Sequence, residues 1–237
     1  IIKCILKLDS QAKRYGGRVI SLLGNHELYT YYLRDDPQFF INYVKTVDKE
    51  KFKSSYNISR KKFLRPGGLG GSLFARTRPF ILQLGEFIFL HGSLTDPMIK
   101  TNLNEHGYVD IKKINNETSN WLRGKGRIPT YLEEMDEDNP VFSRSYSNKK
   151  DFTPSECKRI ETQISFFKDA KYVVMGHSRY KKINAACNKM LIRTDVSLSR
   201  AFGGNLSDKS YQALEILQHD DKQPELNIIT SIKKFPL

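Results

Sequence analysis

Three short apolar runs in this chain each end in a histidine beside a glycine, and this feature constrains the fold most strongly. The run 19–23 leads into Gly24-Asn25-His26, the run 87–90 into His91-Gly92, and the run 172–175 into Gly176-His177. Continuous apolar runs of this length are typical of strands buried on both faces, as in a parallel sheet. The carboxyl ends of such strands share one edge of the sheet, where α/β proteins place their sites. The chain has 5 histidines in all, so three of them in one context indicate a common site.

The residue types at these strand ends are suited to a metal ion. Imidazole nitrogens and an amide oxygen are ligands that Zn²⁺, Mn²⁺ and Fe accept, so Asn25, His91 and His177 are candidate metal ligands. The adjacent glycines let the backbone turn sharply and leave room for a ligand. A single histidine after a strand is more often a hydrogen-bonded structural residue. The metal hypothesis therefore depends on the three motifs occurring together.

The remaining pattern predicts a single α/β domain over residues 1–237. A first helix should end at Gly16-Gly17, residues 80–84 and 87–90 should form a hairpin, and Pro154 should open a helix that runs to Lys168. Further strands are expected near 190–192, 213–217 and 227–230. Two helical insertions are expected at about 28–60 and 104–150, the second of them polar and irregular.

Composition narrows the class of protein. The net charge of +13 favours phosphate-bearing partners, but Lys and Arg occur in scattered short pairs, so nucleic acid is an unlikely partner. No apolar run approaches the roughly 20 residues that a bilayer requires, which excludes an integral membrane protein. The 3 cysteines are an odd number without CxxC spacing, so we expect no disulfide framework and no zinc ribbon. An intracellular, cytoplasmic location is the corresponding expectation.

The order of the three histidine motifs resembles the calcineurin-like metallophosphoesterases, and the segments between them narrow the resemblance. These segments match the Shewanella-like branch of the phosphoprotein phosphatases, and the match extends over nearly the whole chain. They are Phe63-Leu64-Arg65-Pro66-Gly67-Gly68, Thr77-Arg78-Pro79, Pro140-Val141-Phe142-Ser143-Arg144, and Asp195-Val196-Ser197-Leu198-Ser199 with Gly203-Gly204.

The resemblance implies a calcineurin-like β-sandwich flanked by helices, an αββα arrangement, with two divalent metal ions of Mn, Fe or Zn at its strand ends. Asn25, His91 and His177 would then be ligands of the second metal ion. His26 would be the acid near the leaving-group oxygen, and Arg144 would contact the substrate phosphate. Glu27 would orient the Asn-His loop from behind, although a plain salt bridge is an equally good interpretation of this carboxylate.

Two motifs of that family are absent from the sequence. Gly-Asp-x-His-Gly and Gly-Asp-x-x-Asp-Arg-Gly supply the first metal ion's ligands and the bridging aspartate, and they should precede Gly24. Arg179 stands two residues after His177, where many broader metallophosphoesterases have a further histidine ligand. We therefore expect an N-terminal βαβ block to be missing and only the second-site ligands to be present. The chain alone should be nearly inactive, whereas a parent protein with that block should be an active enzyme.

The function implied is that of a metal-dependent phosphoric monoester hydrolase, a serine/threonine or tyrosine phosphoprotein phosphatase with a dinuclear metal centre. Its partner would be a phosphorylated protein or peptide. Two alternatives stay open. A dinucleoside polyphosphate hydrolase resembles the same motifs, and a non-catalytic basic binding module would explain the charge together with the absent ligands.

Overall fold

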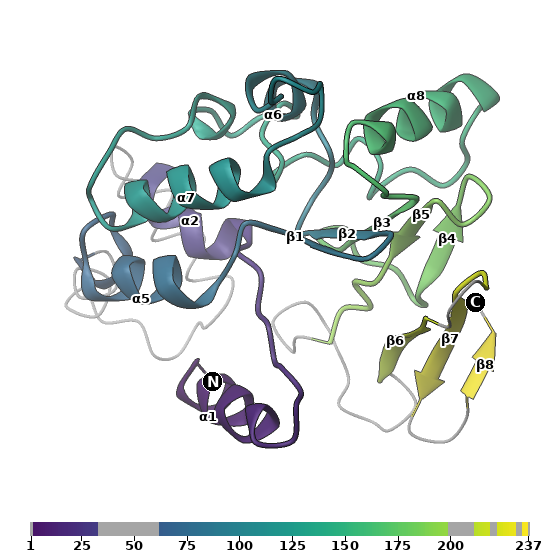
Figure 1. Ribbon diagram of the computed structural model, residues 1–237, viewed down its shortest axis with the longest axis horizontal. Helices are drawn as coiled ribbons and strands as arrows, with labels where there is room; N and C mark the ends of the chain where they lie inside the picture. The colour runs from purple at the N-terminus through teal and green to yellow at the C-terminus, as the bar shows by residue number, and fades with distance from the viewer. Residues whose placement is uncertain (1, 33–61, 199–210, 219–221, 231–233, 237) are drawn as a thin grey trace.

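The computed structural model describes residues 2–32, 62–198, 211–218, 222–230 and 234–236. Two sheets form the framework (Figure 1). The larger sheet has the order β1-β2-β3-β5-β4, with β1 at Ile81–Leu84, β2 at Phe87–Leu90, β3 at Tyr172–Met175, β4 at Asn184–Ala186 and β5 at Leu191–Arg193. The smaller sheet is antiparallel and contains β6 at Gln212–Leu217, β7 at Glu225–Thr230 and β8 at Lys234–Pro236.

The larger sheet is mixed, with parallel strands at its centre. β2 pairs with β3 and β3 with β5 in parallel, whereas β1 and β4 pair with their neighbours in antiparallel. The apolar runs 87–90 and 172–175 form β2 and β3 as predicted, because a central strand has both faces covered. The hairpin from β1 to β2 turns at Gly85, whose φ of +54° suits glycine.

Each face of the larger sheet covers its own core. On one face, Phe87, Val174 and Ile192 pack with Leu226 and Ile228 of the smaller sheet. The other face belongs to a larger core that also takes in helices and loops, with Ile88, Trp121 and Ile160 among its buried members. Two packed sheets flanked by helices are the α/β arrangement that the sequence predicted.

The helices among the described residues are α1 at Ile2–Lys13, α2 at Asn25–Tyr32, α5 at Leu69–Thr77, α6 at Asp96–Thr101, α7 at Ile111–Leu122 and α8 at Pro154–Ser165, with a 3₁₀ turn at Thr130–Leu132. In Figure 1, α2, α5, α6 and α7 lie together on the β1 side of the larger sheet, α8 lies over its β3–β5 part, and α1 lies apart from them. A capping box of Thr153 and Glu156 begins α8 at the predicted proline. The insertion at 104–150, which was expected to be polar and irregular, contains the helix α7. In the insertion predicted at 28–60, residues 33–60 lie outside the described residues.

The segment Val19–Leu23 is a correction to the sequence analysis. It was expected to be a buried strand, but it is extended chain without a place in either sheet among the described residues. Val19 and Ile20 are 37% and 39% exposed, whereas Leu23 is buried at 1%. The segment joins α1, at the bottom of Figure 1, to the rest of the molecule.

The cysteines are a second correction. Cys157 of α8 and Cys187 of the turn between β4 and β5 form a disulfide, with Cα atoms 5.2 Å apart. Cys4 is free and exposed. The odd count and the absence of CxxC spacing were misleading because spacing along the chain carries no information on a contact between a helix and a distant turn. A disulfide persists in oxidising surroundings, so the cysteine count does not support a reducing compartment.

Candidate active site

Two neighbouring parallel strands carry two of the candidate histidines. His91 follows β2 and His177 lies two residues beyond β3, and the register pairs Leu90 with Met175. The N–H of Gly176 donates to the His91 carbonyl over 2.9 Å, which continues the strand pairing to the site. As a result, His91 Nε2 lies 3.1 Å from His177 Nδ1.

Asn25 reaches the same point from the first residue of α2. The Leu23 N–H donates to the carbonyl of Pro79 over 3.0 Å, which fixes the approach to α2 beside the chain that enters β1. Asn25 is 3% exposed, and its Oδ1 lies 2.8 Å from His91 Nε2. The structure thus brings Asn25, His91 and His177 together, as the sequence predicted for the candidate ligands.

The hydrogen bonds identify which ring nitrogens carry protons. His177 Nε2 lies 3.0 Å from the Phe142 carbonyl, which can only accept, so this nitrogen is protonated and Nδ1 keeps its lone pair. Burial lowers the pKa of His91 to about 3, assisted by the charges of His177, His26 and Arg144. Burial also lowers the pKa of His177 to about 4, with Arg144 adding to the effect. Both rings are therefore neutral at pH 7.

The Gly24 backbone supports the His91 ring. A Cβ atom on Gly24 would lie 3.0 Å from His91 Nδ1, so only glycine lets the ring lie this close to the backbone. The Gly24 N–H donates to Glu27 Oε2 over 2.9 Å, and Glu27 Oε1 accepts from Arg78 over 2.8 Å. Glu27 therefore ties the Asn-His loop to Arg78. Glu27 thus contacts the loop through the Gly24 N–H and also forms a salt bridge with Arg78.

His26 lies on the partly exposed side of this cluster. Its charged form would oppose protonation of both His91 and His177, which places it near both rings. Its ring meets Tyr29 edge to face with centroids 5.5 Å apart, and Tyr29 meets Phe142 in the same way at 5.2 Å. His26 is therefore positioned beside the candidate ligands.

Arg144 lies next to His177. Its Nη1 donates to the His177 carbonyl and to Ser178 Oγ, each over 3.2 Å. Its own backbone N–H donates to Glu137 Oε2 over 2.8 Å. Burial alone would raise the pKa of Glu137, but hydrogen bonds from Ser145, Arg144 and Ser143 outweigh this effect and lower it. Glu137 is thus a charged acceptor that fixes the backbone carrying Arg144.

Sequence reasoning missed several contributors to this arrangement. The Phe142 carbonyl sets the His177 tautomer, Arg78 holds Glu27, and Ser178 receives Arg144. Phe142 and Arg78 fall inside the segments that carried the family resemblance, which was the available signal. Asp195 follows β5 and raises the pKa of His177 slightly against the other effects.

The candidate donor set consists of two imidazoles and one amide. Among the described residues, no group of three or more His, Cys, Asp and Glu side chains could hold a metal ion by itself. A cavity of about 840 Å³ lies elsewhere, between α1, residues 18–21, α5 and α7, and its lining includes Arg76 and Arg123. The candidate ligands and Arg144 do not line it. None of the helices in the described ranges has the length and apolarity that crossing a bilayer requires.

Comparison with solved structures defines the class of fold. A mutant of a cold-active protein tyrosine phosphatase superimposes with a TM-score of 0.61 and 18% identity over 98% of this chain and 62% of that chain. The cold-active protein-tyrosine phosphatase of a psychrophilic Shewanella species gives a TM-score of 0.58 at 17% identity. At these identities the comparison shows that the chain has the same α/β fold.

Comparison with curated proteins identifies the branch. Shewanella-like protein phosphatase 2 of Arabidopsis thaliana is 25% identical over 246 residues, covering 88% of this chain and 60% of that protein. Shewanella-like protein phosphatase 1 of Plasmodium berghei (strain Anka) is 26% identical over 209 residues, which cover 86% of this chain and 54% of that protein. The uncharacterized protein R398 of Acanthamoeba polyphaga mimivirus is 26% identical, and the match covers 95% of this chain and 97% of that protein. No family model matches.

These relatives confirm the resemblance to the Shewanella-like phosphatase branch that the motifs indicated. The chain spans 60% and 54% of the length of the two named phosphatases.

Proposed function

We propose that this chain supplies the second-metal half of the active site of a metal-dependent phosphoric monoester hydrolase acting on phosphorylated protein. The observation that carries the proposal is that Asn25 Oδ1 and His177 Nδ1 both approach His91 Nε2, over 2.8 Å and 3.1 Å. The names of the related phosphatases support the reaction class.

The residues present fit a divalent cation. Two neutral imidazoles and an amide oxygen suit Mn, Fe or Zn. His177 donates its second ring N–H to a backbone carbonyl, which is the support that metal-binding histidines usually have. His91 Nε2 faces an amide oxygen and a ring lone pair, so without a cation it carries the proton and donates to both. Binding of a cation would move that proton to Nδ1 or to solvent. When bound, the metal ions polarise the phosphoryl group for attack.

The other site residues then have distinct tasks. Arg144 holds the substrate phosphate through its planar guanidinium, whose geometry matches phosphate oxygens. His26, in its protonated form, gives a proton to the departing oxygen, an effect of about 10²- to 10⁴-fold in rate. Glu27 and Arg78 keep the Asn-His loop in place.

Cobalt binding tests the proposal without requiring turnover, because Co²⁺ reports its ligands by visible absorption. The chain should bind Co²⁺, and the His91→Ala and His177→Ala variants should each lose most of the affinity. His106→Ala is the matched control, because His106 has a side chain that is 74% exposed, and it should bind as the wild type does. Equal Co²⁺ binding by all four proteins would refute the proposed site.

Hydrolysis is a separate measurement. Because no Gly-Asp-x-His-Gly or Gly-Asp-x-x-Asp-Arg-Gly motif occurs in the sequence, we expect the 237 residues alone to hydrolyse p-nitrophenyl phosphate poorly. Manganese-dependent hydrolysis by this chain that disappears in His91→Ala would contradict that expectation. Faster turnover of a dinucleoside tetraphosphate than of a phosphopeptide would favour the dinucleoside polyphosphate hydrolase instead.

A further inference from the structure

Two chain segments run side by side away from the candidate active site, and both are basic. The segment 144–150 begins at Arg144 and ends at Lys150, and the segment 177–182 begins at His177 and ends at Lys182. Ser147 Oγ lies 2.7 Å from Ser178 Oγ, and Tyr180 OH donates to the Lys149 carbonyl over 3.1 Å. These contacts join the two segments as far as Lys149 and Tyr180.

A buried cation, Arg193, contacts both segments. Arg193, at the end of β5, is only 4% exposed. Its guanidinium donates to the Lys149 carbonyl, to the Tyr180 hydroxyl and to Asn184 Oδ1, and it lies 4.6 Å from the Tyr180 ring centroid. All of these acceptors are neutral, and no described carboxylate forms an ion pair with Arg193. Its charge is therefore not offset by a described ion pair and adds to the positive potential of the two segments.

Four of the exposed cations along the segments are also without an ion-pair partner among the described carboxylates. Lys150, Lys181 and Lys182 are exposed and form no ion pair with a described residue, and Arg144 donates to neutral acceptors only. We call Arg144, Lys150, Lys181, Lys182 and Arg193 the basic strip. Lys149 is excluded from it because Glu156 neutralises its charge.

The carboxylates near the basic strip form no ion pair with its members among the described residues. Glu137 is occupied by N–H and O–H donors from residues 143–145. Glu156 pairs with Lys149, and Asp195 accepts the N–H of Ser197. Asp151 is beside Lys150 in the sequence. A row of cations that begins at Arg144 is thus left open to a ligand of opposite charge.

We propose that the basic strip binds acidic residues that flank the phosphorylated residue of a substrate peptide. The inference rests on the proposed function, because it takes Arg144 as the group that holds the phosphate. Lys150 is six residues from Arg144, a reach of at most about 20 Å, which an extended peptide covers in about six residues. The acidic side chains should therefore lie within about six positions of the phosphorylated residue.

The test compares binding of fluorescein-labelled phosphoserine peptides by anisotropy. One peptide has aspartates around the phosphoserine and the other has asparagines at the same positions. Exposed ion pairs contribute little individually, so several together should make the aspartate peptide bind about tenfold more tightly at low salt. The variant Lys150→Gln/Lys181→Gln/Lys182→Gln should lose most of this difference.

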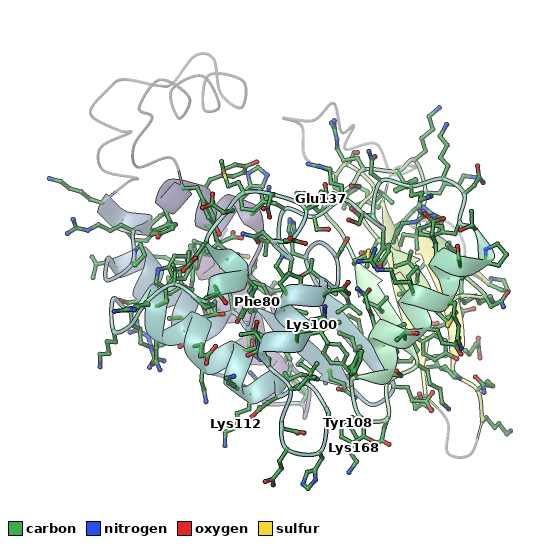
Figure 2. The ribbon with its side chains drawn as sticks, turned by 90° about the horizontal axis from the view of Figure 1, so that it is seen from above. Phe80, Lys100, Tyr108, Lys112, Glu137 and Lys168 are labelled. Carbon is green, nitrogen blue, oxygen red and sulfur yellow. A yellow bond between two sulfur atoms is a disulfide. The ribbon has the colours of Figure 1, made fainter. Side chains whose placement is uncertain are left out.

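A matched control is available on the opposite side of the molecule. Lys112 and Lys168 are exposed and lie far from Glu137, the carboxylate that fixes the Arg144 backbone (Figure 2). Lys112→Gln/Lys168→Gln removes two positive charges, against three in the strip variant, and should keep the preference for aspartate. Equal affinity for the two peptides, or an equal loss of the preference in the control, would overturn the inference.

Two further arms separate this inference from its alternatives. A single-stranded oligonucleotide that displaces the aspartate peptide and depends on the same three lysines would assign the basic strip to nucleic acid and refute the inference. The Co²⁺ titration tests the proposed function independently. Normal Co²⁺ binding without a preference for aspartate would refute the basic strip alone. If the wild-type chain does not bind Co²⁺ but prefers the aspartate peptide, and the three lysines are required for that preference, the metal site is refuted and the basic strip is supported as a peptide-binding surface.

Discussion

The disulfide between Cys157 and Cys187 should contribute substantially to stability, and its contribution can be worked out from the loop it closes. The two cysteines are 30 residues apart. Closing a loop of that size restricts the unfolded chain by about 12 cal/mol/K, which is about 3.6 kcal/mol at 25 °C. The loop contains most of α8, all of β3 and β4, and His177, so the bond stabilises the segment that carries part of the candidate site.

Urea unfolding measures this contribution. The variant Cys157→Ser/Cys187→Ser, or the wild type in dithiothreitol, should unfold at a midpoint lower by about 1 M or more, given a slope near 3 kcal/mol/M for a chain of this size. Cys4→Ser is the matched control because Cys4 is free and exposed, and it should leave the midpoint unchanged. A thiol titration of the unreduced, unfolded chain should find one free thiol.

Identical unfolding curves for the oxidised and reduced proteins would refute this reasoning. If the oxidised wild type, the reduced wild type and the double variant share one midpoint, the bond either does not form or closes a loop that is already restricted in the unfolded state. Three free thiols in the unreduced chain would select the first explanation.

Three other substitutions have defined expectations. Gly24→Ala places a methyl group against the His91 ring and should weaken Co²⁺ binding about 10- to 100-fold, whereas Gly126→Ala, which meets no atom within 4 Å, should not; similar affinities for both variants would contradict the packing argument. Arg78→Met leaves the Glu27 carboxylate without its ion pair and should cost about 1–3 kcal/mol in chemical unfolding, and an unchanged unfolding midpoint would contradict this. Thr153→Ala removes the cap of α8 and should cost about 1 kcal/mol, while Thr153→Ser should retain most of it; equal losses in the two variants would argue against the cap.

The part of the fold that the sequence predicted is the part that local pattern determines. β2 and β3 are continuous apolar runs, and the glycine of the hairpin between β1 and β2 marks its turn. The segment 19–23 has the same apolar character, yet it joins no ladder among the described residues. A strand requires a hydrogen-bonding neighbour as well as an apolar pattern, and a single sequence does not record whether that neighbour is present.

The candidate site was predictable to a similar extent. His91 and His177 follow neighbouring parallel strands, so the topology alone brings them to one edge. The contacts that orient them come from elsewhere in the chain. The Phe142 carbonyl is 35 residues from His177, and Arg78 is 51 residues from Glu27. Such contacts depend on tertiary packing, and no periodicity in the sequence encodes them.

The conformation of His177 indicates that the surrounding structure holds the donor atoms in place. His177 has a φ of +67°, a left-handed conformation that disfavours a residue with a Cβ atom by about 1 kcal/mol or more. In that conformation Nε2–H reaches the Phe142 carbonyl while Nδ1 faces His91. On the other side, the Gly24 backbone supports the His91 ring. Both rings are therefore oriented by contacts that a metal ion does not provide, so His91 Nε2 and His177 Nδ1 face each other before any cation binds.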